Sequence, residues 1–183
     1  KQMDYVCYLD AGREVGVAST KSFTSQIVML SMLSMYLLNE MNKDIYLLPE
    51  QINTTLKMDI IGVSMIQDNC FILGLQDNAY VAKEASLKMK ELACVHAEGY
   101  SSSSLKHGPF ALLDKDFPVI MIQPSDNHFS KNQNIYEEII SRKSPVLTIA
   151  TEKLDRDNVI VVEKNHTYQC ILNMIPLQML SYH

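Results

Sequence analysis

The fold class is decided by residues 118–150, PVIMIQPSDNHFSKNQNIYEEIISRKSPVLTIA. The stretch opens with PVIMIQ and closes with PVLTIA, two short apolar runs, and the segment between them, 131–142, has the period of an amphipathic helix. Continuous rather than alternating hydrophobicity is typical of strands that are buried on both faces of a parallel sheet. The stretch therefore predicts a strand, a helix and a second strand of a parallel α/β fold.

The same alternation continues on both sides of this stretch. Further strands are expected at CFILGL (70–75) and NVIVVE (158–163), and further helices are expected over 80–95 and 168–182. The order is then strand, helix, strand, helix, strand, strand, helix. This order predicts an α/β fold of three layers, in which a parallel sheet is flanked by helices.

Residues before the first of these strands follow a different pattern. A strand-like piece, YVCYL at 5–9, leads into the loop AGREVGVAST, after which a long helix is expected over 21–41 with Ser19 or Thr20 as its N-cap. A second helix is expected over 49–58, with proline in its first turn. The long helix carries an apolar stripe that must pack on another surface, formed by Phe23, Ile27, Leu30, Leu33 and Leu37.

Composition and charge exclude several classes of function. The 183-residue chain has a formal net charge of -5 with both signs scattered, so it offers no basic stripe to a nucleic-acid backbone. Its longest apolar run, residues 27–38, is interrupted and falls short of the roughly 20 residues that span a bilayer. The cysteines stand singly, without CxxC pairs or a histidine at metal-ligand spacing, at Cys7, Cys70, Cys94 and Cys170.

Several expectations about location and partners follow. No leader peptide opens the chain, so we expect a cytoplasmic protein whose cysteines are reduced thiols in the core. We expect no metal, no cofactor, no membrane segment and no nucleic-acid partner.

The first candidate site lies on the helix expected over 80–95. Glu84, Lys88 and Glu91 stand at positions i, i+4 and i+7, within a sector about 60° wide at about 100° per residue. Apolar residues share that sector, and the opposite side carries Lys83, Ser86 and Lys90. Two carboxylates that share one ammonium in a partly dry setting can serve as a general acid or base. The alternative is an ordinary surface ion pair, worth only about 0.2 to 0.5 kcal/mol.

The second candidate site is SSSSLKHGPF, residues 101–110. Gly108 and Pro109 break any helix and would hold the imidazole of His107 on a rigid turn. An imidazole that titrates near neutral pH suits proton transfer between two oxygen atoms. The alternative is a histidine that merely decorates a loop.

The third candidate site is the loop AGREVGVAST, residues 11–20, in which Glu14 is the only carboxylate. Gly12 and Gly16 permit tight turns. Ser19 and the free amides at the start of the following helix could hold an anion or sugar hydroxyls. The alternative, which stays open, is a capped helix after a loop.

These motifs resemble the isomerase portion of the glucosamine-6-phosphate synthases, also called glutamine-fructose-6-phosphate aminotransferases. The matching segments are AGREVGVASTKSFTSQ, AKEASLKMKELACVHAEGYSSSSLKHGP and IPLQMLSYH, which keep the family's order and approximate spacing. The resemblance implies a whole protein with a glutaminase domain and two sugar isomerase (SIS) domains, each a parallel sheet between helices. Residues 1–45 are then expected to be the C-terminal end of the first SIS domain with a connecting helix. Residues 46–183 are expected to be the second SIS domain without its C-terminal tail.

The resemblance also implies catalytic roles. In the family, fructose 6-phosphate is ring-opened, ammonia from glutamine enters at C2, and the resulting imine is isomerised to glucosamine 6-phosphate. Glu91 matches the base that moves a proton from C1 to C2. Lys88 and Glu84 match residues that contact the open-chain sugar and position that base. His107 matches the ring-opening residue, which the family presents to the site of the neighbouring subunit, so a homodimer is expected.

The loop residues match binding positions in the same family. Val17 and Ser19 match positions that contact the sugar, and Glu14 matches a carboxylate near the same pocket. Ser103 and Ser104 depart from the pattern, because the family has Gly-Glu there.

Three elements of the family reaction have no counterpart in this sequence. They are the phosphate loop of the first SIS domain, the Schiff-base lysine of the tail and the glutaminase, so we expect the chain to be inactive alone and to form part of a larger protein. Two other hypotheses remain. One is a non-catalytic SIS module that binds a phosphosugar and regulates another activity, and the other is a structural dimerisation piece with a vestigial site.

Overall fold

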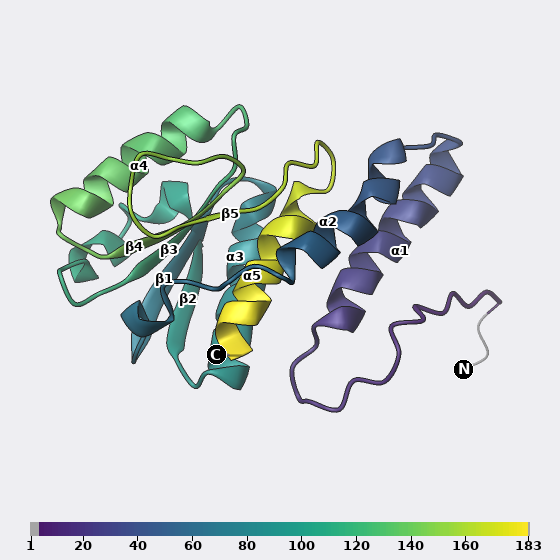
Figure 1. Cartoon of the computed structure of the whole chain (residues 1–183), viewed down its shortest axis with the longest axis horizontal. Helices are drawn as coiled ribbons and strands as arrows, with labels where there is room; N and C mark the ends of the chain where they lie inside the picture. The colour runs from purple at the N-terminus through teal and green to yellow at the C-terminus, as the bar shows by residue number, and fades with distance from the viewer. Residues whose placement is uncertain (1–3, 183) are drawn as a thin grey trace.

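The computed structural model describes residues 4–182, and its centre is a five-stranded sheet (Figure 1). The strands are β1 (Asn69–Gly74), β2 (His96–Ser101), β3 (Val119–Gln123), β4 (Val146–Ala150) and β5 (Val159–Val161). Their spatial order is β2-β1-β3-β4-β5, and every neighbouring pair is parallel. The predicted α/β class with a parallel sheet is confirmed.

Helices cover both faces of this sheet, which gives the three predicted layers. α3 (Asp77–Leu92) and α5 (Gln169–Tyr182) lie on one face, and α4 (Phe129–Ser141) lies on the other (Figure 1). Two short 3-10 turns also lie on the α4 side, η3 (Ser102–Ser104), which we call the serine turn, and η4 (Pro109–Leu112).

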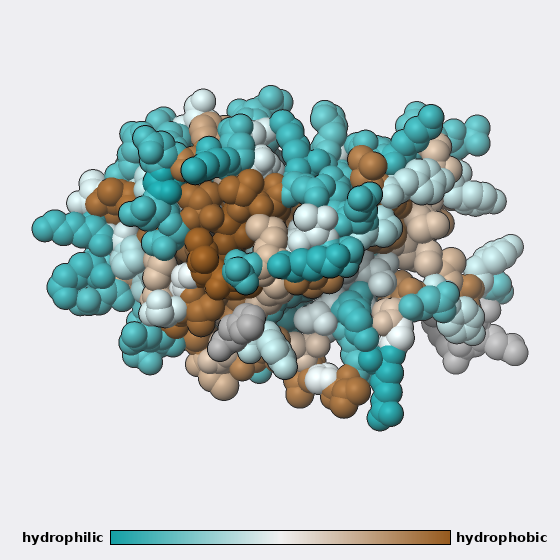
Figure 2. Space-filling model, in the orientation of Figure 1, coloured by the Kyte–Doolittle hydropathy of each residue, from teal (hydrophilic) through white to brown (hydrophobic). Residues whose placement is uncertain are grey.

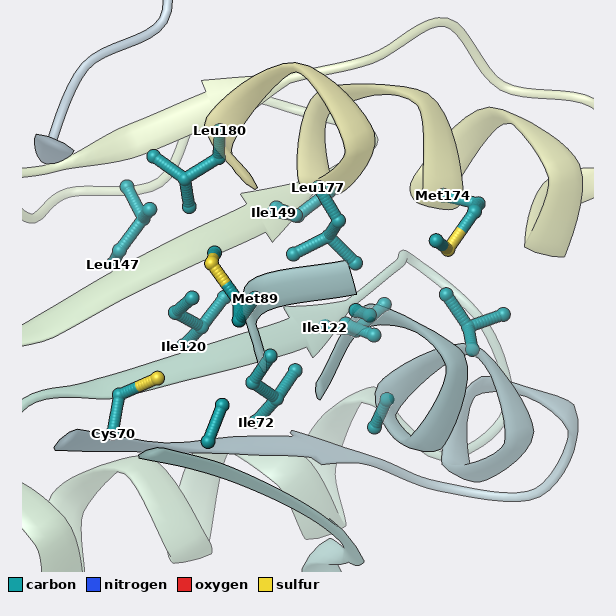
Figure 3. Close-up of a cluster of buried hydrophobic side chains, with 14 of the residues drawn as sticks. Cys70, Ile72, Met89, Ile120, Ile122, Leu147, Ile149, Met174, Leu177 and Leu180 are labelled. Atoms are coloured by element: carbon teal, nitrogen blue, oxygen red, sulfur yellow. The ribbon is translucent and has the colours of Figure 1, made fainter. Parts of the chain in front are cut away.

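The two faces of the sheet each bury an apolar cluster, because alternate residues of a strand point to opposite sides. Toward α3 and α5, Ile72 and Ile120 are fully buried and pack with Met89 and Leu177 (Figure 3). The cluster toward α4 contains Phe71, Leu73, Val119, Met121, Ile135 and Ile139. Burial on both faces is the reason that the strand sequences are continuously apolar.

Residues before β1 form a helical layer beside α5 (Figure 1). It consists of α1 (Lys21–Leu38), the 3-10 helix η1 (Lys43–Leu47) and α2 (Leu48–Thr55), whereas the short turn η2 (Val63–Met65) packs against the apolar cluster between the sheet and α3 and α5. The layer is held to α5 by a small cluster in which Leu48 and Leu172 are buried and Ile27 is partly buried. None of the helices within residues 4–182 is both long enough and apolar enough to cross a membrane.

The strand β2 is not predicted by the sequence pattern. Of its six residues only Ala97 is buried, because β2 is an edge strand, so its apolar signal is weak. Gly99 allows α3 to pack closely on β2, since a Cβ added there would lie 2.4 Å from the carbonyl oxygen of Ala82. The helix expected over 80–95 accordingly ends at Leu92, and the chain turns into β2 four residues later.

The N-terminal layer differs from the expectation in three respects. Residues 5–9 form no strand. A strand needs a neighbouring strand for its backbone hydrogen bonds, and no strand of the described sheet pairs with this segment. The apolar stripe of α1 is covered only at its start, while Leu30, Leu33 and Leu37 are 65%, 44% and 72% exposed. The helix also ends earlier than expected, at Leu38, because Asn39 adopts a left-handed conformation.

Two smaller expectations also need correction. Ser86 was expected on the solvated side of α3, but it is buried, and its hydroxyl donates to the carbonyl oxygen of Lys83. All four cysteines are free thiols, as expected, but Cys7 and Cys94 are exposed and therefore are not core residues.

Candidate active site

α3 brings Glu84, Lys88 and Glu91 together on one face. Lys88 Nζ lies 3.2 Å from Glu84 Oε1 and 2.7 Å from Glu91 Oε2. The side chain of Lys88 is 2% exposed, whereas those of Glu84 and Glu91 are 18% and 26% exposed. We call these three residues the α3 cluster. Its ammonium is enclosed, and its two carboxylates reach toward solvent.

The electrostatics of the α3 cluster keep Lys88 charged. Burial lowers the pKa of Lys88, but the hydrogen bonds to Glu91 and Glu84 raise it by more, so its pKa lies above the ordinary value. Lys88 is therefore a fixed cation near neutral pH. One ammonium neutralises only one of two carboxylates, so a carboxylate at the edge of the cluster is free to accept a proton from a bound molecule.

Glu14 is used by the fold itself, because its carboxylate caps α1. Glu14 Oε1 accepts hydrogen bonds from the backbone amides of Thr20, at 2.8 Å, and Ser22, at 3.3 Å. The Ser22 hydroxyl donates to Glu14 Oε2. These bonds, the Ser22 hydroxyl first and the Thr20 amide second, lower the pKa of Glu14 to about 2. Thr20 is the N-cap residue, but its own side chain makes no capping bond.

The other two predicted loop residues differ in their surroundings. Val17 is 91% exposed. Ser19 is partly buried, and its Oγ lies 2.6 Å from Ser22 Oγ. Figure 2 shows apolar groups at the lower edge of the molecule, over the loop that precedes α1 in Figure 1. Neither side chain forms part of the α3 cluster.

The loop nevertheless ends on the same side of the sheet as α3. The carbonyl oxygen of Thr20 accepts a 3.5 Å hydrogen bond from Gln178 of α5, and Phe23 packs against the apolar cluster that contains Met89 of α3. A pocket of about 550 Å³ opens between α1, α2 and α5, with Thr20, Gln178 and Tyr182 in its lining. Gln178 of the motif IPLQMLSYH lines this pocket and was not among the residues predicted from the sequence.

His107 lies outside the α3 cluster. Its side chain is exposed, and its backbone amide donates to the carbonyl oxygen of Ser104 at 3.0 Å. Its neighbours Leu105 and Phe110 pack into the apolar cluster on the α4 face of the sheet, whereas α3 covers the opposite face. The structure therefore does not bring His107 and Glu91 into one site of a single chain.

A second pocket, not predicted from the sequence, lies at the carboxyl edge of the sheet. It encloses about 450 Å³, and its lining includes Asn78, Ser125, Thr151 and Asn165, which follow four different strands. This edge is where parallel α/β sheets usually bind ligands. The polar residues that follow each strand are the sequence signal from which this pocket could have been predicted. Among residues 4–182, no three His, Cys, Asp or Glu side chains gather in a way that could hold a metal ion.

Comparison with known proteins places these features in a family. The model of the SIS domain matches residues 66–183. A probable glutamine-fructose-6-phosphate aminotransferase (isomerizing) of Acanthamoeba polyphaga mimivirus is 40% identical over 200 residues, which cover all of this chain. The aminotransferase of Chlorobaculum tepidum is 38% identical and covers 96% of this chain. The chain spans only about a third of the length of either relative, 33% and 32%.

Solved structures agree with the sequence comparison. The C-terminal domain of the glucosamine-fructose-6-phosphate aminotransferase from Francisella tularensis superposes with a TM-score of 0.77 at 29% identity, covering 95% of this chain and 56% of the other. A putative phosphosugar isomerase from Clostridium difficile has a TM-score of 0.80 at 16% identity, covering 98% of this chain and 56% of the other, a likeness of fold alone. The family match and the α/β fold agree, and the chain belongs to the SIS domain family, with relatives among the glutamine-fructose-6-phosphate aminotransferases (isomerizing).

Proposed function

We propose that this chain is the isomerising part of an enzyme that makes glucosamine 6-phosphate from fructose 6-phosphate and ammonia released from glutamine. The observation that carries the proposal is the enclosed Lys88 ammonium between Glu84 and Glu91, on a chain whose relatives bear that activity in their names. An ion pair on the surface contributes little to stability. A buried ammonium between two partly exposed carboxylates instead fixes the position of a proton acceptor.

In the proposed reaction Glu91 is the base. It takes a proton from C1 of the C2 imine, the electron pair of that C–H bond forms a C1–C2 double bond, and the C=N π pair moves onto nitrogen, which takes up a proton from solvent. Glu91 then returns the first proton to C2, and the C1 hydroxyl releases its proton to solvent, which leaves an aldehyde at C1 and an amine at C2. Lys88 holds Glu91 in position, and Glu84 holds the other side of the ammonium.

We further propose that His107 acts in the site of a second copy. Its exposed side chain stands on a segment that packs on the α4 face of the sheet, and α3 covers the other face, so in this proposal a partner subunit brings His107 to an α3 cluster. Sedimentation equilibrium of the complete protein tests this, and a protein that remains monomeric at working concentrations would exclude the shared site. In the same proposal residues 1–45 end a first SIS domain and residues 46–183 form the second, with a glutaminase domain elsewhere in the whole protein.

The roles within the α3 cluster are tested by Glu91→Gln in the complete protein. We expect synthesis of glucosamine 6-phosphate to fall by at least about 100-fold, the lower range for loss of a general base. Glutamine hydrolysis should stay near the wild-type rate, because it occurs in another domain. The matched control is Glu137→Gln, a carboxylate on the exposed side of α4, which should change neither rate.

The result also separates the enzyme from the regulatory SIS module. If the complete wild-type protein binds fructose 6-phosphate without converting it, the chain is a phosphosugar-binding module. If Glu91→Gln retains synthesis while Glu84→Gln loses it, the base has been assigned to the wrong carboxylate.

A further inference from the structure

A polar pocket lies between the serine turn and α4, on the face of the sheet opposite to the α3 cluster. It encloses about 310 Å³, and its polar lining consists of Ser102, Ser103, Lys106, Lys131, Asn134 and Glu138. The volume is at the lower end of the range for small-molecule sites, about 300 to 1,000 Å³. The mechanism proposed above uses none of these side chains.

Two buried polar atoms of this pocket have no hydrogen-bond partner within the described part of the chain. Ser102 is 1% exposed and its Oγ is unpaired, and Oε2 of Glu138 is also buried and unpaired. A buried polar atom without a partner lowers stability by about 1 to 3 kcal/mol. Two such atoms at one pocket therefore require an explanation. A bound molecule that supplies both missing hydrogen bonds is such an explanation.

The charges of the pocket define the kind of molecule. Lys106 Nζ lies 2.7 Å from Glu138 Oε1, so one oxygen of Glu138 is already occupied. Lys131 is exposed and adds a second cation, which leaves the lining with an excess of positive charge. The ligand is therefore an anion. It must also donate a hydrogen, because the free oxygen of Glu138 can only accept one.

We infer that this pocket binds a small phosphate-bearing anion that carries its own O–H group. The Ser102 hydroxyl and the Lys131 ammonium donate to phosphate oxygens, and Glu138 Oε2 accepts the ligand's O–H. Monohydrogen phosphate and a phosphorylated polyol both satisfy this requirement. Sulfate has the shape and charge of phosphate but no hydrogen at neutral pH, so it leaves Glu138 facing a bare oxyanion.

The experiment is isothermal titration calorimetry of the 183-residue chain with inorganic phosphate, glycerol 3-phosphate and sulfate, each as the sodium salt at constant ionic strength. We expect phosphate or glycerol 3-phosphate to bind at least about tenfold more tightly than sulfate, since a site that accepts a ligand's hydrogen rejects an analogue without it. The tighter of the first two identifies the source as free phosphate or a phosphate ester. Equal affinity for phosphate and sulfate would overturn the inference and indicate only attraction to exposed lysines.

Ser102→Ala locates the binding, and Ser104→Ala is its matched control in the same turn. Loss of a hydrogen bond to a charged ligand should weaken binding by about tenfold or more in Ser102→Ala. Ser104 does not line the pocket, so its variant should bind as the wild type does. Without ligand, Ser102→Ala should unfold at the same or a higher urea concentration, because it removes an unpaired buried hydroxyl. Phosphate binding that survives Ser102→Ala lies elsewhere and refutes this site.

Glu138→Gln provides a second, independent variant. Its amide can donate a hydrogen that the carboxylate lacks, so selectivity for phosphate over sulfate should be lost while sulfate binding improves. Unchanged selectivity in this variant would contradict the role given to Glu138. The inference would also be overturned if neither phosphate compound gave any binding heat up to about 10 mM. That result would mean a binding free energy weaker than about -3 kcal/mol.

Discussion

The α3 cluster and the region around the serine turn each contain a lysine paired with glutamate, in opposite states. In the α3 cluster one lysine is buried and both of its carboxylates are engaged, and α3 packs so closely on β2 that only glycine fits at Gly99. Beside the serine turn, Lys106 is 63% exposed, its partner Glu138 of α4 keeps one oxygen unpaired, and Gly108 has open space around it. The difference shows that the lysine of the α3 cluster is fully paired within its own helix while its carboxylates remain partly exposed, whereas the pocket beside the serine turn keeps buried polar atoms that have no partner.

The largest expected contrast is between the two glycines. Gly99→Ala would place a Cβ 2.4 Å from the Ala82 carbonyl oxygen, so backbone must move, and we expect a loss of about 3 kcal/mol or more in the free energy of unfolding. Gly108→Ala meets no atom within 4 Å, and only its φ of +130 is strained, so a loss of about 1 to 2 kcal/mol is expected. Urea denaturation of both variants measures the difference. Equal losses would mean that α3 and β2 are not in close contact.

A smaller contrast is expected between the two lysines. Lys88→Met leaves two partly exposed carboxylates without their cation, and we expect a loss of about 2 to 3 kcal/mol, less than for a fully buried pair. Lys106→Met removes an exposed pair and should cost less than about 1 kcal/mol. Urea denaturation in parallel with wild type measures both losses, and a cost for Lys106→Met that equals that of Lys88→Met would remove the distinction between the two regions.

The pH dependence of stability tests the role of Lys88 further. The pKa of Lys88 is raised in the folded state, so its stabilisation is complete below its ordinary pKa of 10.5 and is lost only as the pH rises through the higher folded value. The stability difference between wild type and Lys88→Met should therefore be constant from about pH 7 to about pH 9. A difference that already shrinks over this interval would show that Lys88 loses its proton too early to be a fixed cation.

The smallest effect is expected at Glu14, which is partly buried and whose two carboxylate oxygens both accept hydrogen bonds. Its pKa is lowered from 4.5 to about 2, so its capping of α1 is complete above pH 4.5 and is lost as the pH falls through about 2. We expect the amide resonance of Ser22 to shift across that interval in wild type and not in Glu14→Gln. A titration midpoint near 4.5 would contradict the capping bonds.

Some parts of the site could be predicted from the sequence and others could not. Glu84, Lys88 and Glu91 could be grouped from sequence because helical spacing alone places them on one face. Glu14 could not be assigned as the cap of α1, because its contact with Ser22 spans eight residues and depends on how the loop folds back. The strand β2 was missed because an edge strand buries few residues. Its pairing with β1 uses backbone hydrogen bonds, which do not require particular side chains.

The α/β class, the layers and the α3 cluster could be predicted from the sequence, because hydrophobic periodicity and helical spacing act over a few residues. The tertiary structure was needed to show that Lys88 is buried, that Glu91 and His107 stand on segments that pack on opposite faces of the sheet, and that Ser102 and Glu138 keep unpaired atoms at one pocket. Burial and pairing depend on which distant segments meet, and that information is not contained in any local pattern.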